Sequence, residues 1–235
     1  MMNRLPQTKF SAVVLVLIVL ISSANARVFR PGDDAVFRVR SFLTQDESRA
    51  AIRTEEGLLF IWNRRDLNFT LLIKGQDIRP MNDPNNIFLT VDGRVLQIQS
   101  LPISNFAADA RKNKLDDKAI LAAHRDWETK FLEDELLHSK VAIQSSSEKL
   151  TSGTEALVWQ YDLPEKFKNP DAKTQMYLGI VAKDYIILLN GVVSASSSEA
   201  EVRKFLVGIM TTLKVSSEPI DVKKLQDAIR KGDKP

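Results

Sequence analysis

Apolar and polar residues alternate over much of the first half of the chain, which predicts β-strands. The apolar run Leu58–Trp62 is followed by a charged turn and then by residues 67–75, in which apolar side chains recur at every second position. This pattern predicts a hairpin with one buried face. Asp92-Gly93 lies between two further apolar runs and indicates a second tight hairpin, whose last strand ends at Pro102.

The preceding segment, residues 30–57, fits either a helix or a strand. Asp33 and Asp34 would cap a helix that starts near Ala35 and carries three apolar side chains on one face, namely Val36, Val39 and Leu43. The alternation in Val36–Arg40 would also suit a strand. We expect the helix, with the strand as the alternative.

A long helix is predicted in the middle of the chain, from about Asp109 to Lys140. No Gly or Pro occurs between Ile103 and Ser152. Apolar residues recur at near-helical spacing, at Leu115, Ala119, Ala123, Trp127 and Phe131.

Trp127 is expected at the centre of the buried stripe of this helix. Ile120, Ala123 and Phe131 would lie on the same side. His124 and His138 would then fall at the edges of the stripe, and acidic residues such as Glu128 would lie on the solvated face.

Four more strands are predicted after this helix. Residues 141–150 and 155–164 flank Gly153, and residues 175–182 and 185–193 flank Lys183-Asp184. The first five residues of the last run are all apolar, which is typical of a strand covered on both faces. We therefore expect helices on both sides of the sheet.

A last helix is predicted to begin at Ser198, which can form a capping box with Glu201. Its buried stripe would consist of Val202, Phe205, Ile209 and Leu213. Residues 216–235 form a C-terminal tail that could add one short helix.

The order of predicted elements is a helix, four strands, a long helix, four strands and a helix. Hairpin-like turns dominate, and the central helix is the only long crossover. These features predict one α+β domain over residues 27–215, with a mostly antiparallel sheet of about eight strands. The long central helix and the C-terminal helix would pack on this sheet.

Three features of this pattern resemble the PsbP/DcrB-like exported proteins: strands punctuated by Gly and Pro, a strand ending in LLNGVV (188–193) and a helix ending in TTLKV (211–215). The resemblance covers mainly the last third of the chain and rests on element order, without a signature motif. Because that family consists largely of accessory and interaction proteins, the resemblance implies a non-enzymatic role. It transfers no functional residue to this chain.

The first 26 residues contain the three parts of a secretory signal peptide in order. Arg4 and Lys9 give a positive start, Phe10–Ile21 is apolar, and Ala24-Asn25-Ala26 is a small-x-small cleavage pattern. Cleavage after Ala26 would release the mature chain into the periplasm or the extracellular space. The alternative is an uncleaved membrane anchor, although the apolar run is shorter than the roughly 20 residues of a comfortable span. No later segment is apolar enough to span a membrane.

Composition removes several classes of function. Arg4 and Lys9 leave with the signal peptide, so the 33 basic residues become 31 against 30 acidic ones, and the formal charge falls from +3 to +1. This balance gives no reason to expect a nucleic-acid partner. The chain contains no Cys, which excludes disulfides, thiolate catalysis and Cys-bound metals.

Metal binding is the most specific chemical hypothesis for the predicted long helix, because residues 124–140 contain both histidines of the chain. His124 and Glu128 are four residues apart and would share a helix face, and Glu135 with His138 forms a Glu-x-x-His pair of the kind used in di-iron bundles. The two histidines lie about 21 Å apart along a straight helix and cannot share one ion. The four candidate ligands therefore form two incomplete pairs, and no cofactor is assigned.

Two tryptophans and one sequon also have alternative interpretations. Trp62 and Trp159 lie in predicted strands, where a core position is favoured over sugar stacking. Asn68-Phe69-Thr70 is a glycosylation sequon, and the predicted alternation would point Asn68 outward.

The sequence therefore predicts an exported soluble accessory or binding protein without a catalytic centre, acting on an unknown protein or small-molecule partner. The alternative is a metal-dependent exported enzyme built around residues 124–138.

Overall fold

The first element that the structure describes is a strand, not the expected helix. The computed structural model describes residues 47–81, 87–168 and 172–231, so the predicted signal peptide and the predicted helix start near Ala35 lie outside the described residues. Strand β1 (Glu47–Thr54) occupies the last part of the segment for which we predicted a helix. Three successive residues, Ala50 to Ile52, are buried in clusters on both faces of β1, which favours the strand.

A four-stranded sheet contains the first predicted hairpin, which is confirmed. Strands β2 (Gly57–Arg64) and β3 (Asn68–Lys74) pair antiparallel. With β1 and the short β11 (Lys214–Ser216) they form a sheet in the order β1-β2-β3-β11. The alternating side chains that were expected to face the core, including Phe69 and Ile73, are fully buried.

The prediction that Asn68 points outward is wrong. Asn68 is only 1% exposed, and its side-chain oxygen accepts a hydrogen bond from the backbone N–H of Arg64. Ser216 in β11 pairs alongside it. The added edge strand and the turn between β2 and β3 therefore enclose a side chain that the alternation of β3 alone would have left at the surface.

A seven-stranded antiparallel sheet contains the other predicted hairpins. Its strands follow the order β4-β5-β6-β10-β9-β8-β7. Their bounds are β4 (Ile78–Pro80), β5 (Ile87–Val91), β6 (Arg94–Pro102), β7 (Gln144–Lys149), β8 (Glu155–Asp162), β9 (Thr174–Ala182) and β10 (Tyr185–Val193). The Asp92-Gly93 hairpin and the strand end at Pro102 are confirmed.

The described residues thus contain eleven strands in two sheets, where we expected about eight strands in one. The mostly antiparallel α+β class is confirmed. The three strands that were not predicted are β1, β4 and β11, and two of these have only three residues. Such short edge strands carry too little alternation to be recognised in a sequence.

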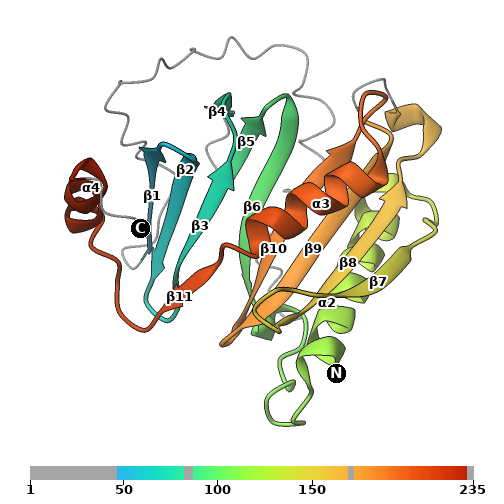
Figure 1. Cartoon of the computed structure of the whole chain (residues 1–235). Helices are drawn as coiled ribbons and strands as arrows, with labels where there is room; N and C mark the ends of the chain where they lie inside the picture. The colour runs from blue at the N-terminus through green and yellow to red at the C-terminus, as the bar shows by residue number, and fades with distance from the viewer. Residues whose placement is uncertain (1–46, 82–86, 169–171, 232–235) are drawn as a thin grey trace.

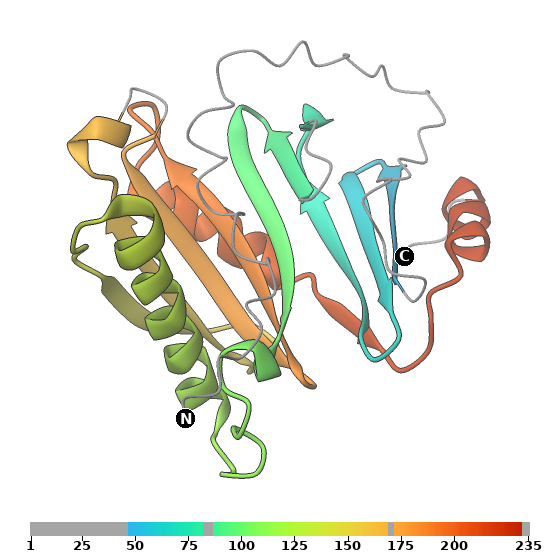
Figure 2. The same cartoon turned by 180° about the vertical axis from the view of Figure 1, so that it is seen from behind.

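Helices cover both faces of the seven-stranded sheet, as the apolar run of β10 predicted (Figures 1 and 2). Helix α2 (Asp117–Phe131) packs on β8 and β9 from one side, and α3 (Glu199–Met210) packs on β9 and β10 from the other. The predicted capping box of Ser198 and Glu201 opens α3. Because α3 also contacts β3, it touches both sheets.

The two sheets share one apolar core, and α3 closes it. Phe60, Phe69 and Leu71 from the smaller sheet belong to the same buried cluster as Leu178 and Leu189 from the larger one. A second core lies between α2 and the opposite face of the larger sheet, and it includes Ile120, Leu121, Trp159, Tyr177 and Leu188.

The C-terminal tail forms the short helix that was expected. Helix α4 (Val222–Arg230) begins after Asp221, whose side chain accepts a hydrogen bond from the Lys224 backbone N–H. The amide of Asn63 exchanges two hydrogen bonds of 2.8 Å with the backbone of Ile220. These bonds place the apolar side of α4 on the outer face of the smaller sheet, over Ala50, Ile52, Leu59 and Ile61.

Candidate functional site

The predicted long helix is present but shorter than expected. Helix α2 begins after Asp116, whose carboxylate accepts a hydrogen bond from the Ala119 backbone N–H at 2.7 Å. Residues 109–116 form turns and irregular structure instead of helix. A π-helical turn, Leu132–Leu137, follows α2 and ends at His138, whose φ of 49° lies in the left-handed region. A left-handed residue cannot continue a right-handed helix, so the helical segment ends there.

The buried face of α2 differs from the predicted one. Ile120, Leu121, His124 and Glu128 are buried, whereas Trp127, Ala123 and Phe131 are only partly buried. The physical reason lies in the sheet: Leu121 approaches the place where a side chain at Gly179 would begin, at 3.4 Å. Leu121 therefore fits on the buried face of α2, and Trp127 lies at the edge, beside Phe106.

Glu128 was expected on the solvated face, but it is 6% exposed. Burial raises the pKa of its carboxyl group from 4.5 to about 7. The phenols of Tyr161 in β8 and Tyr177 in β9 interact electrostatically with Glu128. The carboxyl group is therefore protonated over the mildly acidic range in which an exposed glutamate is charged.

The two tyrosines belong to an aromatic and amide cluster on the α2 side of the sheet. Both phenols donate hydrogen bonds to the side-chain oxygen of Gln175, at 2.5 Å from Tyr161 and 3.2 Å from Tyr177. The Tyr177 ring stacks on Trp159 with a centroid distance of 4.0 Å and an interplanar angle of 3°. Burial raises the pKa of both phenols, so they act as neutral donors.

His124 lies one helical turn before Glu128 and is 1% exposed. Burial lowers its pKa from 6.5 to about 4, so its imidazole is neutral at ordinary pH. Its ring contacts Phe106 edge-on, at a centroid distance of 5.2 Å. Within the described part of the chain, its Nε2 atom has no hydrogen-bond partner.

The structure keeps the two predicted ligand pairs apart. His124 and Glu128 lie on the buried face of α2, while Glu135 and His138 are exposed in and after the π-helical turn. Across residues 47–81, 87–168 and 172–231, no three His, Cys, Asp or Glu side chains are grouped so that they could hold a metal ion.

Sequence reasoning missed the polar row beside this cluster. Gln97 in β6 pairs with Asn190 in β10, and Asn190 pairs with Tyr177 in β9. Gln97 and Asn190 are both 1% exposed. Their signal in the sequence is an amide at a core-facing position of an otherwise apolar strand. The predicted core positions of Trp62 and Trp159 are confirmed, at 3% and 1% exposure.

A hollow of about 330 Å³ lies at the junction of the two sheets, and we call it the junction hollow. It forms where the C-terminal end of α3, strand β11, the β7–β8 loop and the β9–β10 turn converge (Figure 1). Its lining includes apolar side chains, Leu150, Ile180, Met210, Leu213 and Val215, and the hydroxyls of Ser152, Thr154 and Thr211. Val215 is 46% exposed.

This combination of apolar side chains with a few polar groups is typical of a ligand site. The junction hollow could not be predicted from the sequence, because its lining comes from segments that are far apart along the chain. The exposed Val215 carried the one local signal, an apolar residue in a three-residue edge strand.

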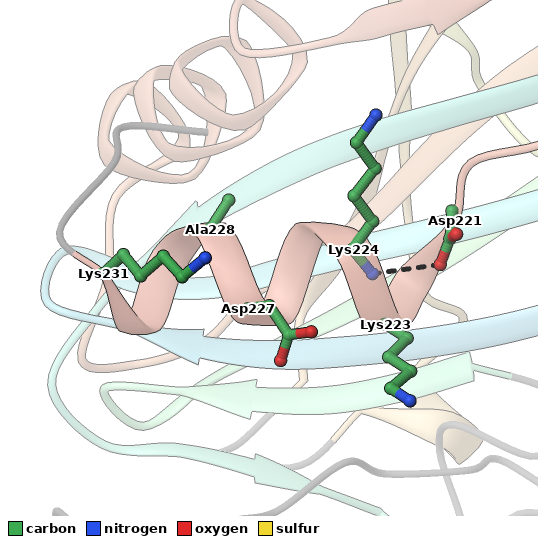
Figure 3. A pocket seen from close by; sticks show the side chains of 6 residues that line it. All are labelled: Asp221, Lys223, Lys224, Asp227, Ala228 and Lys231. Carbon is green, nitrogen blue, oxygen red and sulfur yellow. Dashed lines mark hydrogen bonds between the residues drawn. The ribbon is translucent and has the colours of Figure 1, made fainter.

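A second hollow, of about 520 Å³, lies along α4. Its described lining consists of Asp221, Lys223, Lys224, Asp227, Ala228 and Lys231, which all project from this one helix or its cap (Figure 3). Its side chains are mixed in charge, and among the described residues no second element contributes to the lining. The surface therefore offers fewer convergent contacts than the junction hollow.

The comparisons with known proteins give no match. No family model, no curated protein and no solved structure matches the chain. In the described part of the chain, no helix has the length and apolar character needed to cross a membrane.

Proposed function

We propose that the chain is an exported accessory protein that acts by binding a small amphipathic molecule in the junction hollow. The observation that carries the proposal is the lining of this hollow, which both sheets and α3 build together. Accessible apolar side chains such as Leu213 and Val215 would cover the apolar part of a ligand, and the hydroxyl oxygens would accept hydrogen bonds at its polar end.

The position of the ionisable residues supports binding over catalysis. His124 and Glu128 lie on the α2 side of the larger sheet, whereas the junction hollow involves residues on the α3 side, including Ile180 and Met210. The larger sheet separates the two regions.

The proposal of export rests on the sequence of residues 1–26, and the resemblance to PsbP/DcrB-like proteins implies the same accessory role.

Displacement of a neutral fluorescent reporter, N-phenylnaphthylamine, tests this proposal. We expect saturable binding with one site per chain and displacement by decanol. Val215→Glu should weaken reporter binding about tenfold or more, because it places a charge beside the apolar lining.

Leu115→Glu is the matched control, since Leu115 at 37% and Val215 at 46% are the exposed large apolar residues of the described chain. Equal loss in both variants, or no saturable binding to the wild type, would overturn the proposal.

The metal-dependent alternative stays a prediction that needs further ligands for His124 and Glu128. Elemental analysis of protein purified without chelators tests it. A stoichiometric metal that is lost on His124→Ala and kept on His138→Ala would favour this alternative.

A further inference from the structure

The charge on the lining of the junction hollow has one sign. Among its described lining residues, Lys183 is the single charged one, and the others are apolar or carry hydroxyl groups. A ligand that fills this hollow therefore meets apolar surface and one cation. Such a lining is complementary to a molecule with an apolar body and one negative charge.

Lys183 is placed by the turn between β9 and β10. Its φ of 54° lies in the left-handed region, and its side chain reaches across to the smaller sheet. The ammonium group contacts the carbonyl oxygens of Asp66 at 3.3 Å and of Ser216 at 3.5 Å. Both contacts are longer than a usual charge-assisted hydrogen bond of about 2.8 Å, so a carboxylate would make a stronger partner.

The carboxylate next to Lys183 in the sequence is already paired. Asp184, the next residue of the turn, accepts a hydrogen bond from Arg111 at 3.1 Å. Arg111 also donates to the backbone carbonyl of Lys183. Within the described residues Lys183 forms no ion pair, so its positive charge remains available at the mouth of the hollow.

We propose that the junction hollow binds an anionic amphiphile, a medium-chain monocarboxylate whose head group pairs with Lys183. Its tail packs on Leu213 and Val215, and its carboxylate replaces the long contacts of the ammonium group to the two carbonyls. This inference rests on the proposed function and names the class of ligand.

The geometry favours a small molecule over a peptide strand. The volume of about 330 Å³ falls at the lower end of the range for small-molecule sites. A peptide that added to the sheet would need a long free edge, whereas the adjoining strand β11 has three residues.

Comparison of three ligands with equal tails tests the inference: decanoate, decanol and decylamine, each measured by displacement of the neutral reporter. We expect decanoate to bind about three- to tenfold tighter than decanol, and decylamine to bind weakest, with the preference shrinking as salt is added. Equal binding of decanoate and decanol would overturn the inference while leaving the proposed function intact. No binding of any of the three would overturn both.

Substitution of Lys183 tests whether this side chain causes the preference for decanoate over decanol. Lys183→Met should abolish the preference for decanoate while decanol still binds, and Lys183→Arg should restore it. Lys118→Met removes an exposed lysine on α2 and should leave the preference unchanged. A preference that survives in Lys183→Met would overturn the role of Lys183, and a peptide that displaces the reporter better than decanoate would contradict the choice of ligand class.

Discussion

His124 and Glu128 occupy core positions that apolar residues usually fill. Their side chains are 1% and 6% exposed, and both titrate away from their ordinary ranges because burial disfavours the charged form. Each therefore costs stability over a particular range of pH. The two ranges overlap, and the two effects have opposite signs.

For Glu128, the pKa is raised from 4.5 to about 7 in the folded protein. Between these values the unfolded chain has released the proton and the folded chain retains it, so the free energy of unfolding falls as pH rises. For His124, the pKa is lowered from 6.5 to about 4. Between these values the unfolded chain binds a proton that the folded chain does not, so the free energy of unfolding rises with pH. Each slope is about 1.4 kcal/mol per pH unit.

We therefore predict that these two contributions cancel between pH 4.5 and pH 6.5 in the wild type. Glu128→Gln removes the contribution that falls with pH. The free energy of unfolding of the variant minus that of the wild type should therefore increase by about 1.4 kcal/mol per pH unit over this range. Urea unfolding at several pH values measures the difference. His124→Gln should shift the profile in the opposite direction.

His138→Gln is the matched control for the histidine, because His138 is exposed after the π-helical turn. It should leave the profile parallel to that of the wild type. A Glu128→Gln profile that also runs parallel to the wild type would contradict the assignment of a buried, protonated carboxyl group.

At this scale the sequence could predict that His124 and Glu128 share a face of α2, but not which face is buried. The apolar residues of the helix favoured Trp127 as its centre. In the structure Leu121 lies on the buried face instead, in contact with the position of Gly179, a residue more than fifty positions away in the chain. Sequence periodicity cannot report such a long-range fit.

Helix α3 packs closely against β10. A side chain added at Gly191 in β10 would begin 3.1 Å from a methyl group of Val202 and 3.3 Å from one of Leu206. Gly208, in contrast, lies on the exposed side of α3, with no atom within 4 Å of the place where a side chain would begin. The side of α3 that packs on Gly191 of β10 is thus crowded, whereas its exposed side is open at Gly208.

We predict opposite effects at these two positions. Gly191→Val should destabilise the protein by about 1–3 kcal/mol, because the added methyl groups overfill the contact between α3 and the sheet. Gly208→Ala should stabilise it by about 0.5–1 kcal/mol, since alanine costs less backbone entropy in a helix. Chemical denaturation measures both, and destabilisation by Gly208→Ala would contradict the described exposure.

Most elements were predictable because their signals are local. The Asp92-Gly93 turn, the capping box of Ser198 and the apolar run of β10 each identify one element without knowledge of the rest. The strand β1 was not predicted, because its residues become buried only when β2 and α4 cover them. The prediction that Asn68 points outward was wrong for a similar reason, because Asn68 is covered by residues of other segments, including Ser216 in β11.

The two sheets and α3 determine the properties of the whole molecule. They share one core, and the junction hollow lies where this shared core reaches the surface beside β11. Neither sheet alone forms that hollow. The hollow could not be predicted from the sequence, because the relative position of the two sheets is fixed by packing and not by the pattern within either sheet.

Methyl NMR of the purified protein, titrated with decanol and with decanoate, tests the binding role most directly. The proposal predicts saturable shifts of the methyl groups of Ile180, Met210 and Leu213 that report one site, while those of Ile120 and Leu121 under α2 stay in place. Shifts centred on the α2 side of the sheet, or no saturable shift at any of these methyl groups, would contradict it.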